Sequence, residues 1–157
     1  MLMARTQKLT TQQIGKLGEL LVQYRLLSFG IESAHLTTDS GIDLVAYSPN
    51  RKAAFTIQIK TNLQPKPGGG KGKAALDWWV PQDSPAELFA FVDVSESRVW
   101  LFAHSELEQH AQQKSNGRFH FYMYTDPSVN RRKITSASLV NEFEEFALEN
   151  RIGSLFQ

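Results

Sequence analysis

The sequence predicts a mixed α/β (α+β) fold in which helices cover a central mixed sheet. Three observations predict it: a helical apolar period near the N-terminus, several short strand-like segments through the middle, and a second helical pattern near the C-terminus. With 157 residues, of which 41% are hydrophobic and 21% charged, the chain is expected to form one domain over residues 1–157 with a genuine core.

Composition narrows the classes of function. The formal net charge of +1 creates no strong overall attraction to nucleic acid or to a membrane, so a nucleic-acid role must rest on local basic groups. The absence of cysteine excludes disulfides, thiolate chemistry and cysteine-ligated zinc. The sequence shows no apolar signal core and no membrane-spanning stretch, so we expect a cytoplasmic protein that does not contact a membrane.

The first predicted helix covers residues 10–30. Thr10 followed by Gln13 matches a capping box at the start, and Gly30 is a plausible stop. Gly18 and Glu19 lie inside this helix. The apolar residues that recur at helical spacing are Ile14, Leu17, Leu21, Tyr24 and Leu27.

The clearest strands form a hairpin of residues 42–47 and 53–60, which follows a weaker extended segment at 31–39. Side chains alternate between the faces of a strand, so Gln58 and Lys60 share one face of the second strand. Pairing in the hairpin is expected to bring Asp43 beside both of them.

The second half of the chain alternates loops and strands before the last helix. The expected elements are an irregular loop at 64–73, a short strand at 77–80, a strand pair at 88–94 and 99–103, a short helix capped by Ser105 and ending near Gln113, a strand at 119–125, and a helix from about 136 to 150 that ends near Gly153.

The polar residues of the hairpin suit a metal-dependent hydrolytic site. Asp43 offers a carboxylate, Gln58 an amide oxygen and Lys60 an ammonium. Magnesium prefers oxygen ligands, and a bound metal can support phosphodiester hydrolysis. A second interpretation is that Gln58 and Lys60 only keep an edge hairpin soluble.

Three short segments resemble the PD-(D/E)xK superfamily of restriction-endonuclease-like nucleases: Gly18-Glu19, Gly41-Ile42-Asp43 and Gln58-Ile59-Lys60. The resemblance covers residues 10–62. Glutamine at the position of the usual acidic residue is similar to the branch of the Mrr-type restriction enzymes. The chain departs from the superfamily after Lys60, where a helix usually follows and this sequence has a Pro/Gly/Lys loop.

The resemblance implies a role for each matching residue. Asp43 would bind Mg²⁺, for which Mn²⁺ can substitute, and the Gln58 amide and the Ile59 backbone carbonyl would add oxygen ligands. Lys60 would orient or activate the attacking water, and Glu19 would contact water held by the metal. Because Gln58 is neutral, metal affinity should be lower than with a second carboxylate.

The sequence therefore predicts a magnesium-dependent endonuclease acting on DNA. One alternative is a non-catalytic module of the same fold that binds nucleic acid or a protein partner, and another is a plain interaction protein. The lysines of the irregular loop are interpreted either as a phosphate-contacting arm or as a solvated surface. They are Lys66, Lys71 and Lys73.

Two apolar features have more than one interpretation. The last helix has an apolar side that belongs to the core or extends a homodimer surface. In an extended segment Trp78 and Trp79 point to opposite faces, so one is expected in the core and the other in an interface or against a base.

Overall fold

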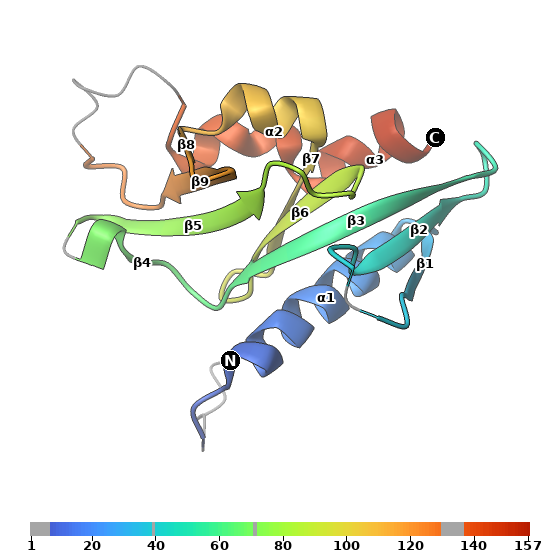
Figure 1. Ribbon diagram of the computed structural model, residues 1–157, viewed down its shortest axis with the longest axis horizontal. Helices are drawn as coiled ribbons and strands as arrows, with labels where there is room; N and C mark the ends of the chain where they lie inside the picture. The colour runs from blue at the N-terminus through green and yellow to red at the C-terminus, as the bar shows by residue number, and fades with distance from the viewer. Residues whose placement is uncertain (1–6, 39, 71, 130–136) are drawn as a thin grey trace.

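The computed structural model describes residues 7–38, 40–70, 72–129 and 137–157, which form two sheets and three α-helices (Figure 1). The first sheet has the strand order β1-β2-β3-β6-β7. Its strands are β1 (Glu32–His35), β2 (Leu44–Ser48), β3 (Ala53–Asn62), β6 (Leu88–Asp93) and β7 (Arg98–Ala103). The second sheet has the order β4-β5-β9-β8. Its strands are β4 (Lys66–Pro67), β5 (Ala74–Pro81), β8 (Gln113–Ser115) and β9 (Arg118–Tyr124).

The first sheet is mixed. β2 and β3 form the expected antiparallel hairpin, with Leu44 opposite Ile57. β3 then runs parallel to β6, with Ile59 beside Ala90, and β6 pairs antiparallel with β7. The predicted mixed sheet flanked by helices is therefore confirmed.

Among its described residues, the connection between the parallel strands β3 and β6 contains no α-helix. Parallel neighbours need a long crossover, which is usually helical. Here residues 63–87 hold β4, a 3₁₀ segment at Gly68–Gly70, and β5. The loop predicted as irregular at 64–73 thus contains a two-residue strand, because Lys66 and Pro67 pair with the start of β5.

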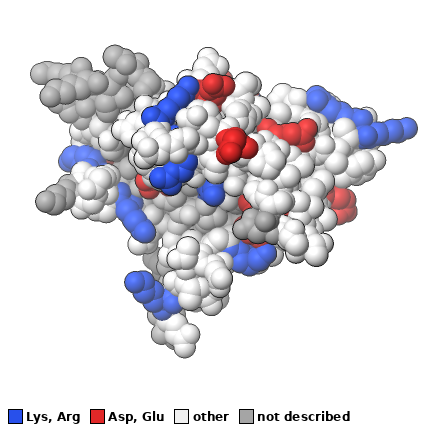
Figure 2. Space-filling view, in the orientation of Figure 1, with Lys and Arg blue, Asp and Glu red and all other residues white. Residues whose placement is uncertain are grey.

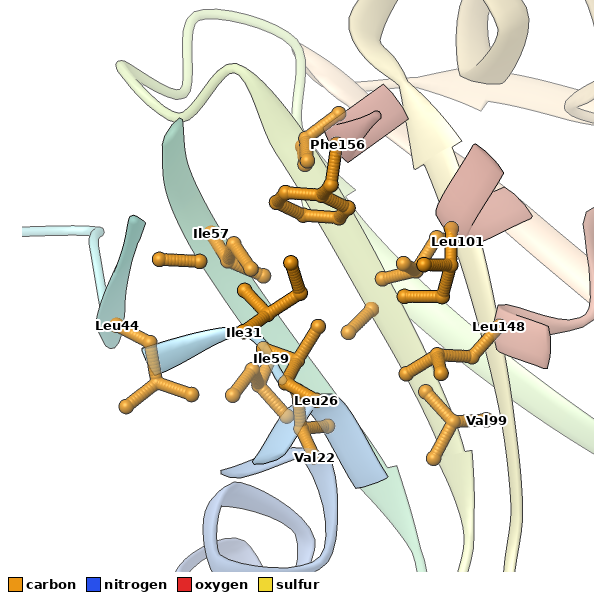
Figure 3. Packing of buried hydrophobic residues seen from close by; sticks show 14 of the residues in the cluster. Val22, Leu26, Ile31, Leu44, Ile57, Ile59, Val99, Leu101, Leu148 and Phe156 are labelled. Atoms are coloured by element: carbon orange, nitrogen blue, oxygen red, sulfur yellow. The ribbon is translucent and has the colours of Figure 1, made fainter. Parts of the chain in front are cut away.

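The central strand β6 divides the core into two parts, since all six of its residues are buried. Leu88, Ala90 and Val92 pack with α1 (Thr11–Ser28) and α3 (Leu148–Phe156) on one face of the sheet (Figure 3). Phe89 and Phe91 face an aromatic cluster under the second sheet, which also contacts α2 (His104–His110). The order of layers is helices, first sheet, second sheet.

The N-terminal helix starts as predicted. The Thr10 hydroxyl accepts the N–H of Gln13 at 3.2 Å, and the Gln13 side chain accepts the N–H of Thr10 at 2.9 Å. Its buried face differs from the predicted apolar stripe, because Gly18, Val22 and Leu26 are buried. Leu17, Tyr24 and Leu27 remain exposed, because a close approach at Gly18 decides which side of the helix meets β3.

The predicted bounds of both later helices are wrong, and α2 ends at His110 rather than near Gln113, which belongs to β8. Ser105 does not cap α2: the helix starts at His104, and the Glu106 carboxylate accepts the N–H of Ala103 at 2.8 Å. The predicted last helix is divided into a 3₁₀ segment, Val140–Phe146, and α3, which continues through Gly153. The break lies at Ala147, whose extended backbone pairs with Trp100 of β7.

The apolar side of the last helical region belongs to the core. Phe143, Phe146 and Leu148 are all buried within the protomer, so these side chains offer no dimer surface. A homodimer stays a prediction. Among the described residues, no helix has both the length and the hydropathy needed to cross a membrane.

Candidate functional site

Asp43 lies where regular pairing between β2 and β3 ends. Its N–H donates to the carbonyl of Ile57 at 2.8 Å, and its Oδ2 accepts the N–H of Ile59 at 2.6 Å. The carboxylate thus takes the place of a backbone carbonyl as the acceptor of the Ile59 N–H, at the point where β2 begins. This contact holds Asp43 against the peptide between Gln58 and Ile59, one residue before Lys60.

Gln58 is nearly buried, at 7% exposure, and its amide is held in one orientation. Its Oε1 accepts the hydroxyl of Ser84 at 2.8 Å, and the same hydroxyl oxygen accepts the N–H of Ala86 at 3.3 Å. Ser84 lies in the loop that leads into β6, the parallel neighbour of β3. The Gln58 amide oxygen is therefore oriented by a residue from outside its own hairpin. Nothing in the sequence pattern singles out Ser84.

Glu19 and Lys60 line one cleft of about 480 Å³. The cleft is bounded by the first turns of α1, the end of β3 and part of β5, and Ile59, Lys66 and Asp77 also line it. Glu19 lies at its helical wall, where Oε2 contacts Lys16 Nζ at 2.5 Å and His35 Nδ1 at 3.4 Å. Neither of these two neighbours was predicted as part of the site.

The close packing of α1 against β3 places Glu19 at the cleft. A Cβ atom built on Gly18 would lie 1.8 Å from the hydroxyl oxygen of Thr61. Only glycine permits this approach without a shift of helix or strand. The glycine before Glu19 therefore has a structural reason, which is to bring Glu19 toward the end of β3.

The two described lysines of the predicted loop, Lys66 and Lys73, have different neighbours. Lys66 lines the cleft with Lys60 and Glu19. Lys73 lies 3.8 Å from the carboxylate of Asp126. The pKa of Asp126 is below its usual value, mainly because Ser128 donates hydrogen bonds to the carboxylate and to a smaller extent because of Lys73. Lys71 lies outside the described residues.

The donor chemistry of the site fits a hard divalent cation. Asp43 contributes a carboxylate and Gln58 a buried amide oxygen, and hydrogen bonds orient both groups. A strand residue directs its N–H and C=O toward the same neighbour, so the Ile59 carbonyl faces the side on which Asp43 lies. Among the described residues no group of three or more His, Cys, Asp or Glu side chains could hold a metal, so a cation here would depend on the amide and backbone oxygens.

No protein-family model and no curated protein matches this sequence. Solved structures do resemble it. One is the bacterial homing endonuclease I-Ssp6803I, with a TM-score of 0.54 and 12% identity over 78% of this chain and 84% of that chain. Another is Hjc from Archaeoglobus fulgidus, a Holliday junction resolvase from an archaeal hyperthermophile, with a TM-score of 0.46 and 14% identity over 68% of this chain and 81% of that chain.

At these identities the similarity concerns the fold alone. The evidence for the shared fold is the homing endonuclease structure. The restriction-endonuclease-like fold expected from the sequence is therefore confirmed. Membership of the PD-(D/E)xK superfamily, the Mrr-type branch and the roles of the site residues stay predictions.

Proposed function

We propose that this protein is a divalent-metal-dependent nuclease that hydrolyses phosphodiester bonds in DNA, on the glutamine branch similar to the Mrr-type enzymes. One observation carries the proposal. The Asp43 carboxylate is fixed by the Ile59 N–H between Gln58 and Lys60, and Ile59 and Lys60 line the cleft that Glu19 also lines. A chance pattern of polar surface residues would not require a carboxylate to replace a backbone partner at that position.

The residues that would hold Mg²⁺, or Mn²⁺ in its place, are Asp43 and Gln58 through their side chains and Ile59 through its carbonyl. When bound, such an ion offsets charge on the phosphate and makes water easier to deprotonate. Lys60 would donate hydrogen bonds from its ammonium to the attacking water or to a phosphate oxygen. Glu19 would accept hydrogen bonds from water on the opposite wall of the cleft and so help to orient it.

The alternative function is a non-catalytic module that binds nucleic acid or a protein partner. The observation that favours it is Gln58, which is neutral and already accepts a hydrogen bond from Ser84. A site with one carboxylate should bind Mg²⁺ weakly. The two functions therefore differ in measurable metal affinity as well as in cleavage.

Cleavage of single-stranded, duplex and branched DNA, with Mg²⁺ or Mn²⁺, tests the proposal. Asp43→Asn keeps an acceptor for the Ile59 N–H, and Lys60→Met keeps the length of the side chain, so both variants should stay folded. Each should lower the cleavage rate at least about 100-fold. The matched control is Lys52→Met, at the opposite end of β3, which should cleave like wild type.

Two results would count against the nuclease. The first is wild-type protein that cleaves none of these substrates with either metal. The second is a cleavage rate that survives both Asp43→Asn and Lys60→Met. Calorimetric titration with Mg²⁺ completes the test, because binding to wild type that is lost in Asp43→Asn supports the proposed ligand set independently of turnover.

A further inference from the structure

The outward face of the second sheet carries a row of aromatic rings. Along β5 the inward residues are buried, including Trp78 at 2% exposure, whereas Trp79 is half-buried on the outward face. On β9 the outward residues are His120, Tyr122 and Tyr124, also half-buried. The rings of Trp79 and His120 stack with centroids 4.1 Å apart, and successive rings along β9 are 5.4 and 5.5 Å apart. We call these four residues the ring platform.

A cleft of about 700 Å³ opens beside the ring platform. His120, Tyr122 and Tyr124 form its aromatic wall, and the backbone of Gly68–Gly70 lies opposite. Pockets that bind small organic groups usually measure about 300–1,000 Å³. The space is therefore sufficient for the base of a nucleotide.

The ring platform adjoins the candidate catalytic cleft. Lys66 and Asp77 line both the cleft of Glu19 and Lys60 and the cleft of the rings. A polymer seated at Lys60 can thus continue past Lys66 onto the rings. Two separate clefts joined by shared residues favour a ligand with repeated units over one small molecule.

Two cationic side chains and one acidic side chain lie beside the rings or at the junction of the two clefts. The Arg118 guanidinium lies 4.8 Å from the centre of the Trp79 ring, and Lys66 lies at the junction of the two clefts. Asp77 is the opposing charge, and its carboxylate contacts His120 at 3.2 Å. Burial, and secondarily Tyr124, raise the pKa of Tyr122.

Stacking explains this face better than backbone attraction does. Figure 2 shows basic side chains spread over the visible surface with acidic side chains among them, rather than one continuous basic track. Aromatic side chains bind the exposed faces of unpaired bases with little dependence on sequence. Bases inside a duplex are stacked on one another, so their faces are not available to these rings.

We propose that the ring platform binds the bases of an unpaired nucleic-acid strand that leads into the cleft of Lys60 and Glu19. The place of this strand next to the scissile bond rests on the proposed nuclease function, whereas binding itself needs no cleavage. The preferred substrates are then those with a single-stranded segment beside the cleavage point, such as flaps and splayed branches. Uninterrupted duplex is the poorer substrate.

Fluorescence anisotropy with a labelled oligothymidine of about 15 nucleotides, near the upper end of known single-strand site sizes, tests this proposal. Titrations contain a chelator, so that no cleavage occurs, and a duplex of equal length is compared at the same salt concentration. Tyr122→Ala and Tyr124→Ala should each weaken single-strand binding about 5- to 150-fold. Tyr122→Phe keeps the ring and should bind like wild type. The matched control is Tyr24→Ala, which changes an exposed tyrosine (68%) on α1.

Tryptophan fluorescence gives a second measurement that does not depend on a variant losing affinity. Trp78 and Trp100 are each 2% exposed, so Trp79, which is half-buried beside the ring of His120, is the tryptophan whose emission a strand bound on this face should change. Unlabelled oligothymidine should quench part of the emission of wild type. Trp79→Phe keeps an aromatic ring and should lose this quenching while it still binds the strand.

The outcomes separate this proposal from the nuclease. Single-strand binding that depends on Tyr122 supports the platform even if no substrate is cleaved. Cleavage of duplex by a protein whose affinity for single strands is unchanged in Tyr122→Ala and Tyr124→Ala overturns the platform and leaves the nuclease standing. A duplex affinity equal to the single-strand affinity also overturns the platform. So does a wild-type protein that binds neither oligonucleotide.

Discussion

Replacing Gly18 by alanine should destabilise the protein by about 1–2 kcal/mol, although alanine is the better helix former. A Cβ at this position would lie 1.8 Å from Thr61 Oγ1 and 2.8 Å from both Cβ and Cγ2 of the same residue. Rotation of the Thr61 side chain moves Oγ1 and Cγ2 but leaves its Cβ in place. Helix α1 or strand β3 must therefore shift.

The magnitude follows from two opposing effects. Overpacking in a filled core typically costs about 1–3 kcal/mol. Removing a glycine from a helix interior returns about 0.5–1 kcal/mol. The matched control is Gly15→Ala in the same helix, where a Cβ would meet nothing within 4 Å and where alanine should stabilise by roughly that second amount. The two alanine variants should thus differ by roughly 2 kcal/mol.

Urea unfolding followed by far-UV circular dichroism measures both variants against wild type. Thr61→Ala removes Oγ1 and Cγ2, so Gly18→Ala should cost less in that background, with a coupling of at least about 0.5 kcal/mol. Equal unfolding free energies for Gly18→Ala and Gly15→Ala would refute the close-approach explanation. Because Glu19 follows Gly18 directly, a shifted helix should also lower any cleavage activity.

Three further predictions concern the cap, the metal site and the ring platform. Thr10→Ala should cost about 1 kcal/mol in urea unfolding, because the Gln13 N–H loses its acceptor, whereas Thr10→Ser should cost little. Gln58→Glu adds a second carboxylate and should raise Mg²⁺ affinity in calorimetry; unchanged affinity would place the metal elsewhere. The pKa of Tyr122 is raised above 10.0, so its contribution to stability is complete below pH 10 and is lost as pH rises through the folded-state pKa. Phenolate absorbance should therefore show one tyrosine that titrates late, and Tyr124→Phe should move it to lower pH.

Local features of the sequence predicted much of the structure. The Thr10–Gln13 cap and the alternation around Gln58 involve neighbours within a few residues, so their consequences can be derived without knowledge of the fold. The hairpin was also predicted, because its two strands are separated only by a short turn, and its register brings Asp43 to the peptide between Gln58 and Ile59. The long apolar strand β6 was also recognisable, because a strand buried on both faces has no polar alternation.

Features that depend on distant partners were missed or wrong. β8 was not predicted, since three residues from Gln113 to Ser115 become a strand only by pairing with β9. The last helix was drawn too long at one end and too short at the other, because its break at Ala147 is caused by pairing with Trp100. The buried side of α1 was predicted wrongly for the same reason. The close contact between Gly18 and Thr61 of β3, rather than the spacing of the leucines, decides which side of the helix is buried.

The sequence by itself determined the two elements that carry the candidate site: a capped helix with Gly18-Glu19, and a hairpin that carries Asp43, Gln58 and Lys60. Only the tertiary structure decided that Ser84 orients the Gln58 amide and that Glu19 shares a cleft with Lys60. It also decided that β9, paired with the strand after the Pro/Gly/Lys loop, places a row of rings beside that cleft. The physical reason is that helix capping and side-chain alternation depend on residues close together in the chain. A cleft depends instead on how segments far apart in the chain pack against one another.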